Sequence, residues 1–428
     1  MQLNNQEKIM TKGKRLYIIE AALEYFVTIV VGGAYLAKIT SAIGMSQGLT
    51  GILTSFISLG ALFQIFALFF SGIKRPKKLI VTISSVSYLL FACLYLIPSV
   101  AVSTIFKHVV FVLFLFVGFA FYNLSHAPKI GWAMSFVHET ERGVFTDKKE
   151  AVSLLSGIVF SYLVSFVIDY YESINRLDVA FIISAISIFM ITVGHSLSLI
   201  LMQDREIPTI SSEKISFSKT LKLILTNRSV LKVFVVAVLS NIVHCSIVGF
   251  FGTYAISEVR GHGLEYSMIF ISVVSMVACL LRAFVSKPCG KIADRYSFKV
   301  LCMFCYGIYA IAFIFATFMS PGKSKVFYVV FYALQALANA GTSSGIINLL
   351  YEEVLPEQRM SAYAVQQAVS GVLGFLSAIL SGLFVDYVHT KGGTLGGLFA
   401  QQWLSILGVV LMFFIVLFIF FFMRKKNN

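Results

Sequence analysis

Apolar runs of about 20 residues recur along the whole chain, and each is long enough to cross a bilayer core of roughly 30 Å. Of the 428 residues, 58% are hydrophobic and only 13% are charged, against about 25% charged in soluble domains. The pattern excludes an ordinary soluble domain. It predicts an all-α polytopic membrane protein.

The runs predict twelve membrane-spanning helices. The first run lacks the small-residue cleavage site of a signal peptide, so we expect it to remain as a span. Connections are mostly short, so neighbouring spans should be antiparallel. The expected spans are 16–41, 47–72, 79–99, 108–134, 151–170, 179–202, 230–256, 265–286, 300–319, 325–350, 362–386 and 400–423.

The positive charges are distributed as a membrane topology requires. The chain has 34 Lys and Arg and a net charge of +14, which could suggest a nucleic-acid partner. Most of these residues, Lys77 and Lys129 among them, fall at the chain ends or in alternate connections, and few, such as Lys38 and Lys107, fall on the other side. This asymmetry predicts cytoplasmic termini and no nucleic-acid binding.

The two halves of the chain repeat each other. When Glu141–Tyr170 is laid on Gln358–Tyr387, the pair Asp169-Tyr170 meets Asp386-Tyr387. Small residues at every fourth position also coincide, and this spacing lets membrane helices approach closely. These positions are Ser153, Gly157, Ser161 and Ser165 in the first copy and Ser370, Gly374, Ala378 and Gly382 in the second.

The longest polar interval lies at the middle of the chain and contains an amphipathic stretch around Phe217–Leu225. The predicted domains are a six-helix half at 1–202, a cytoplasmic linker at 203–229 and a second half at 230–428.

A charged stretch, Ser286–Lys299, separates two apolar runs and carries Gly290, Asp294, Arg295 and Lys299 in the pattern G-x-x-x-D-R-x-x-x-K. Two tightly joined membrane helices need a glycine where backbones approach, an acid to cap the next helix and bases on the cytoplasmic side. We expect these residues to form such a hinge.

This stretch resembles the signature loop of the major facilitator superfamily, found between the second and third helices of each six-helix half. The corresponding loop in the first half of this chain, at Gly72, departs from the pattern. It has Pro76 in place of the acid and Lys77 in place of the arginine. The resemblance implies two halves facing a midplane cavity, alternating access, and a cytoplasmic latch containing Asp294 and Arg295. It does not imply a substrate, because the fold carries sugars, drugs, peptides and ions.

Acidic side chains within spans are functional candidates, because an unpaired charge costs several kcal/mol in a membrane. Glu20 and Glu24 share one face of the first span, although Glu20 is close enough to its end to be interfacial. We hypothesise that Glu24 is the coupling carboxylate, which takes up and releases a proton as the cavity changes face.

Other polar residues at mid-span are candidates for lining the substrate cavity. Arg282 aligns with Gln64 in the repeat and needs a partner, either Glu24 or an anionic substrate, unless it extends to the membrane surface. The remaining candidates are Asn241 and His244, Gln335 and Asn339, and Asn123 and His126, whereas Gln366 and Gln367 could be interfacial.

The sequence therefore favours a secondary transporter of a small solute in the cell membrane, coupled to protons and monomeric, with no cofactor. The Gly-rich Lys loop of ATP-binding proteins is absent, and His138-Glu139 lacks the second histidine of a zinc protease, so neither an ATPase nor an enzyme is expected. The six cysteines lie in or beside spans, and we expect neither a disulfide nor a metal site. Uptake of a sugar-like nutrient, efflux of amphipathic cations and a sensor without flux remain open.

Overall fold

The computed structural model describes residues 2–69, 75–138, 141–204, 217–257, 263–322, 325–355 and 358–423, and almost all of them are helical. The exception is a short antiparallel pair of strands, β1 (Thr394–Leu395) and β2 (Leu398–Phe399), with Thr394 opposite Phe399. By their contacts, the residues form two compact units. The first contains Met1–Met45 and Gly60–Lys214, and the second contains Ser46–Leu59 and Ile215–Asn428.

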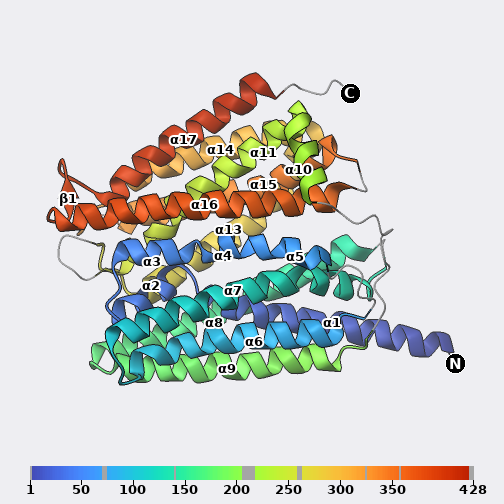
Figure 1. Ribbon diagram of the computed structural model, residues 1–428, viewed down its shortest axis with the longest axis horizontal. Helices are drawn as coiled ribbons and strands as arrows, with labels where there is room; N and C mark the ends of the chain where they lie inside the picture. The colour runs from blue at the N-terminus through green and yellow to red at the C-terminus, as the bar shows by residue number, and fades with distance from the viewer. Residues whose placement is uncertain are drawn as a thin grey trace. The chain divides into compact units, whose positions relative to one another are not determined.

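The first unit is built from long helices that run alongside one another, as α6, α7 and α9 do in Figure 1. Ser103 begins α7 by accepting a hydrogen bond from the Phe106 backbone N–H, the usual role of an N-cap serine. The elements are α1 (Gln2–Val30), α2 (Gly33–Ala42), η1 (Ala61–Phe63), α5 (Gln64–Phe69), α6 (Lys77–Leu96), η3 (Ile97–Ser99), α7 (Thr104–Met134), α8 (Arg142–Ser173) and α9 (Leu177–Leu201).

The second unit contains the helices of the C-terminal part of the chain and two short helices from its beginning. Its elements are α3 (Gln47–Thr54), α4 (Phe56–Gly60), α10 (Phe217–Thr226), α11 (Arg228–Ser246), η5 (Val248–Phe250), α12 (Phe251–Ile256), α13 (Met268–Arg295), α14 (Phe298–Thr317), α15 (Lys325–Glu353), α16 (Arg359–Thr390) and α17 (Ala400–Phe422). The amphipathic stretch predicted near Phe217 is helical, as α10. The predicted domain boundaries themselves stay a prediction.

The lengths and hydropathies of the helices agree with a chain that crosses a membrane many times. Ten described helical segments are long and apolar enough to span, and the pair α1–α2, bent by 49°, raises the number to eleven. Helix α15 has 29 residues and is thus also long enough to span. Large apolar side chains such as Phe284 and Leu380 are exposed, as expected for surfaces that contact lipid.

The repeated rows of small residues lie at close helix contacts, as predicted. A Cβ atom added to Gly157 of α8 would lie 2.5 Å from the ring of Tyr25 on α1. Its counterpart on Gly374 of α16 would lie 2.6 Å from Asn241 Nδ2 on α11. The Tyr35 hydroxyl of α2 donates to the Ser161 carbonyl oxygen of α8 at 2.8 Å. A hydrogen bond therefore joins α2 to α8 at the next small residue of the same row.

The expected hinge at Ser286–Lys299 is instead mostly helix. Helix α13 continues to Arg295, so Gly290 and Asp294 are helical, and only two residues separate α13 from α14. The cap of α14 is Ser297, which accepts from the Val300 N–H, and not Asp294. A Cβ on Gly290 would meet no described atom within 4 Å, so close backbone approach does not explain this glycine.

The structure also describes Lys299 and the second span, but not Gly72. Lys299 donates to the Met423 carbonyl oxygen at the end of α17, so this base completes a helix end. The second span was expected to be one helix, but it breaks after Thr54 and again at the 3₁₀ turn η1. Gly72, which aligns with Gly290, lies outside the described residues.

Candidate functional site

A group of four ionisable side chains lies buried in the first unit, and we call it the charge cluster: Glu20 and Glu24 of α1, Lys129 of α7 and His195 of α9. Lys129 Nζ lies 2.9 Å from Glu20 Oε1 and also contacts Glu24 Oε2. His195 Nε2 lies 2.9 Å from the same Glu20 oxygen. Glu20 and His195 are 0% exposed, so neighbouring protein must stabilise their polar atoms.

Aromatic side chains surround the charge cluster. The Tyr88 ring of α6 stands edge-on to the His195 ring, with centroids 4.4 Å apart. Tyr88 and Tyr122 both interact electrostatically with Glu24, and His126 Nδ1 lies 3.6 Å from Glu24 Oε1, beyond hydrogen-bond distance. These rings limit the exposure of the carboxylates and leave each charge more dependent on its protein partners.

The formal charges of the charge cluster do not sum to zero unless the cluster binds a proton. Two ionised carboxylates face one ammonium, which leaves one negative charge when His195 is neutral. Two buried atoms in the cluster, Glu20 Oε2 and His195 Nδ1, have no hydrogen-bond partner among the described residues. One added proton, on a carboxyl or on the imidazole, neutralises the group.

The same residues could be considered as metal ligands. Three ligand atoms lie within 4.8 Å of one another, one each from Glu20, Glu24 and His195. The Lys129 ammonium, however, already contacts both carboxylates. A cation therefore occupies this place as a lysine side chain, and the geometry suits proton exchange better than metal binding.

The structure extends the sequence-based candidates in the first unit. Glu20 is fully buried and forms an ion pair with Lys129. Lys129 was interpreted as a topology marker, but it lies inside α7 and is 2% exposed. Glu24 thus has a cation partner that the sequence analysis overlooked. A lysine inside the expected span 108–134 and a histidine inside 179–202 were the signals that could have identified Lys129 and His195.

Two further candidates pair with each other beside the charge cluster's helices. Gln64 of α5 donates to Asn123 Oδ1 of α7 at 2.9 Å. Asn123 Nδ2 donates in turn to the Phe119 carbonyl oxygen, one helical turn back. Both amides are therefore engaged in joining α5 to α7.

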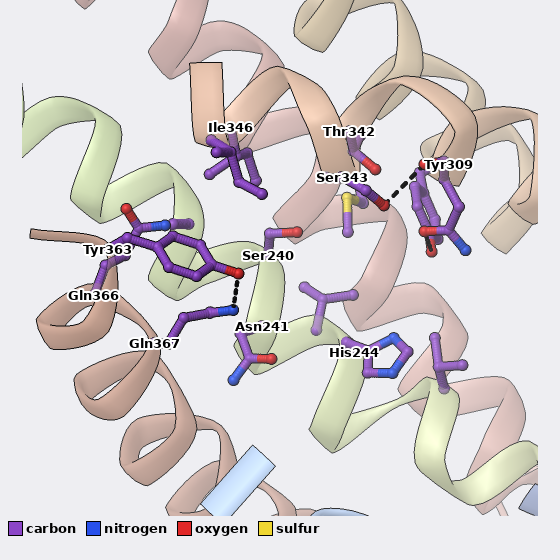
Figure 2. A pocket seen from close by; sticks show the side chains of 16 residues that line it. Ser240, Asn241, His244, Tyr309, Thr342, Ser343, Ile346, Tyr363, Gln366 and Gln367 are labelled. Carbon is purple, nitrogen blue, oxygen red and sulfur yellow. Dashed lines mark hydrogen bonds between the residues drawn. The ribbon is translucent and has the colours of Figure 1, made fainter. Parts of the chain in front are cut away.

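The second unit contains a pocket of about 330 Å³ formed by α11, α14, α15, α16 and α17 (Figure 2). Asn241 and His244 of α11 and Asn339 of α15 line it, and their role in a substrate cavity stays a prediction. Tyr363, Gln366 and Gln367 of α16 and Tyr309 of α14 complete its polar lining. The sequence analysis left Gln366 and Gln367 as residues that could be interfacial. The signal that could have identified them as pocket residues was the pair of consecutive amides on one helix.

Hydrogen bonds hold several of these side chains in place. Tyr309 donates to Asn339 Oδ1 at 2.9 Å, and Gln367 donates to the Tyr363 hydroxyl at 2.8 Å, drawn dashed in Figure 2. Asn241 donates to the Ser370 carbonyl oxygen at 2.6 Å. The pocket walls are thus ordered before any ligand arrives, which lowers the entropic cost of binding.

Two candidates of the second unit do not line this pocket. Gln335 is buried on α15 beside Tyr309. Arg282 is exposed on α13 and acts on Tyr309 electrostatically. The anionic substrate considered as a partner of Arg282 therefore gains no support from the pocket lining.

Comparison with known proteins relates both units to transporters. The model of the Major Facilitator Superfamily matches residues 18–324 and 280–428. No curated protein sequence matches the chain. Among solved structures, a mutant of the nucleoside transporter NupG is similar with a TM-score of 0.75 and 12% identity, over 97% of this chain and all of that one.

Two other solved structures are similar in fold. An auto-inhibited POT family peptide transporter has a TM-score of 0.71 and 13% identity, over 99% of this chain and 98% of that one. A D-xylose–proton symporter has a TM-score of 0.68 and 14% identity, over 95% and 97%. At such identities the likeness shows the fold, namely twelve helices in two halves. The chain belongs to the Major Facilitator Superfamily and has the fold of its multi-pass membrane transporters.

Proposed function

We propose that the protein is a secondary active transporter that moves a small solute by alternating access and couples this movement to protons. The observation that carries the coupling proposal is the charge cluster, in which two buried carboxylates share one lysine. An uncompensated charge in a membrane costs several kcal/mol, so the cluster favours binding one proton when it is closed to water.

Charge neutralisation supplies the mechanism. When the cluster opens to the side richer in protons, Glu24 or the Glu20–His195 pair takes up a proton, and Lys129 stays bound to the remaining carboxylate. Closure of the water path then traps a neutral cluster, and the halves can change access at low electrostatic cost. When the cluster opens to the other side, the proton leaves. The acceptor groups come from α1 and α9, and the fixed cation comes from α7.

Similar proteins support the solute classes to test. The solved structures resembling this chain are described as a nucleoside transporter, a D-xylose–proton symporter and a peptide transporter. Uptake of such a nutrient is therefore the main proposal, and efflux of amphipathic cations is the second. Both place a monomeric carrier in the cell membrane with both termini in the cytoplasm.

The test uses the full chain reconstituted in liposomes that contain a pH-sensitive dye. Uridine, D-xylose, alanyl-alanine and tetraphenylphosphonium are added separately, and proton movement is recorded with uptake of the labelled solute. A transported solute should move protons in the wild type. Glu24→Gln should keep exchange of labelled for unlabelled solute but lose proton movement. Equal proton movement in Glu24→Gln would contradict the role of Glu24, and binding of a solute without flux would instead indicate a sensor.

A further inference from the structure

We infer that the pocket of the second unit binds a neutral, hydroxylated ring compound the size of a sugar or a nucleoside, and not an organic ion. This inference deepens the proposed function by naming the substrate class, and it rests on that function only for the step of transport. Binding itself requires only the pocket.

The first reason is the charge of the lining. No Asp, Glu, Lys or Arg is among the described residues that line the pocket. An organic cation would leave water without meeting a carboxylate, and an anion would meet only the His244 imidazole and no lysine or arginine, so desolvation of either ion is poorly compensated. Neutral solutes avoid this cost, so the lining selects against both classes of ion.

The second reason is an acceptor without a partner. Gln366 lines the pocket and is 2% exposed, yet its Oε1 accepts no hydrogen bond from the described residues. A buried amide oxygen left in this state is unfavourable, because it has lost its hydrogen bonds to water without gaining others. A ligand that offers an O–H or N–H to Gln366 recovers this free energy, which an apolar compound cannot do.

The third reason is that donors and acceptors are both presented. The Tyr363 hydroxyl accepts from Gln367 Nε2 and keeps its own proton to donate. Four primary amides line the pocket: Asn241, Asn339, Gln366 and Gln367. Amides read adjacent donor–acceptor edges, as Asn and Gln do with adenine. Hydroxyl pairs of a sugar and the edge of a nucleobase both present such groups.

The fourth reason is size. A volume of 330 Å³ is near the lower end of small-molecule sites, which span about 300–1,000 Å³. This size favours a monosaccharide or a nucleoside over a larger amphipathic drug or an oligosaccharide.

The test is calorimetric titration of the full chain in detergent at one pH, without any gradient. The neutral probes are D-xylose, D-glucose, uridine and adenosine. The charged counterparts are glucuronate and glucose 6-phosphate for the sugars and uridine monophosphate for the nucleosides, and tetraphenylphosphonium represents organic cations. We expect at least one neutral probe to bind, and its charged counterpart to bind at least tenfold more weakly. If only the sugars bind, the pocket recognises pairs of hydroxyl groups. If only the nucleosides bind, it recognises the edge of the nucleobase.

Two matched variants separate ligand binding from folding. Gln366→Leu removes the unpartnered acceptor, so it should weaken binding at least tenfold while the thermal stability of the ligand-free protein stays the same or rises. Gln402→Leu is the control, because Gln402 is also buried but accepts from the Phe399 N–H and donates to the Thr317 carbonyl oxygen. It should lower thermal stability and change affinity less than twofold.

Binding of charged probes only, binding of no neutral probe, or undiminished affinity in Gln366→Leu would each overturn the inference. Failure of the coupling proposal looks different. In that case neutral probes bind, Gln366→Leu weakens them, and flux in liposomes is indifferent to the pH gradient and to Glu24→Gln.

Discussion

Glu20 and His195 share a 2.9 Å contact between α1 and α9, although they are 175 positions apart in sequence. The same Glu20 oxygen lies 2.9 Å from Lys129 Nζ. One carboxylate oxygen therefore joins three helices, and the protonation of one group must affect the position of the other two. This arrangement makes the charge cluster a structural element of the first unit as well as a candidate for proton coupling.

Lys129→Met should destabilise the protein by about 3–5 kcal/mol, because it leaves two buried carboxylates without their cation. Adding Glu20→Gln to Lys129→Met should restore at least half of this loss, since one of the repelling charges is removed. Thermal stability in detergent, followed by fluorescence-detected size exclusion, measures both effects. A double variant no more stable than Lys129→Met alone would contradict the charge-balance argument.

His195→Gln should alter the pH dependence of transport more than its maximal rate. Glutamine can still donate to Glu20, but it cannot take up a proton near neutral pH. If the imidazole shares the coupled proton, the acid limb of the pH profile should move by about one pH unit, the effect of one nearby charge. The profile is measured as uptake of a labelled substrate between about pH 5 and pH 8. Ser196→Ala, on the next residue of α9, is the control and should leave the profile in place.

Gly157→Ala and Gly290→Ala form a matched pair of helical substitutions with opposite expected signs. The new methyl group on Gly157 would meet the Tyr25 ring at 2.5 Å, so overpacking should cost about 1–3 kcal/mol. On Gly290 it meets no described atom, so the gain in helix propensity, about 0.5–1 kcal/mol, should appear as higher stability. The midpoints of thermal unfolding of the two variants and the wild type test this prediction. Equal changes in the two variants would mean that the α1–α8 contact accommodates the added methyl group without loss of stability.

Asp386→Ala should loosen helix α3. The carboxylate accepts from the Ser46 hydroxyl at 2.8 Å and from the Gly48 N–H at 3.0 Å, at the positive end of the α3 dipole. Loss of such a cap costs about 1 kcal/mol. Hydrogen exchange of the peptide that covers α3 should become several-fold faster, whereas Asp294→Ala, on an exposed part of α13, should leave that peptide unchanged.

The fold and the helix contacts were largely predictable from sequence because the membrane imposes simple rules on both. Apolar length gives the spans, and small residues at every fourth position identify the close contacts at Gly157 and Gly374. The partners of the ionisable residues were harder to predict. Lys129 fits the rule for cytoplasmic bases equally well, and only its three-dimensional position beside Glu24 distinguishes a partner of buried carboxylates from a topology marker.

The pocket shows a second limit of sequence reasoning. Asn241, His244 and Asn339 were found from their depth in the spans, but Gln366 and Gln367 lie near a predicted helix start and seemed interfacial. Helix α16 begins at Arg359, so both amides are about two turns inside it.

The path of the chain through α3 restricts how this protein can be recombined. Residues 46–59 belong to the second unit, although unit-one segments precede and follow them. Gly48 lies so close to α16 that an added Cβ would be 2.3 Å from the Gly382 carbonyl oxygen. A chimaera joined at the central linker would therefore combine α3 of one parent with α16 of the other. Functional hybrids should require that residues 46–59 be exchanged together with the C-terminal half.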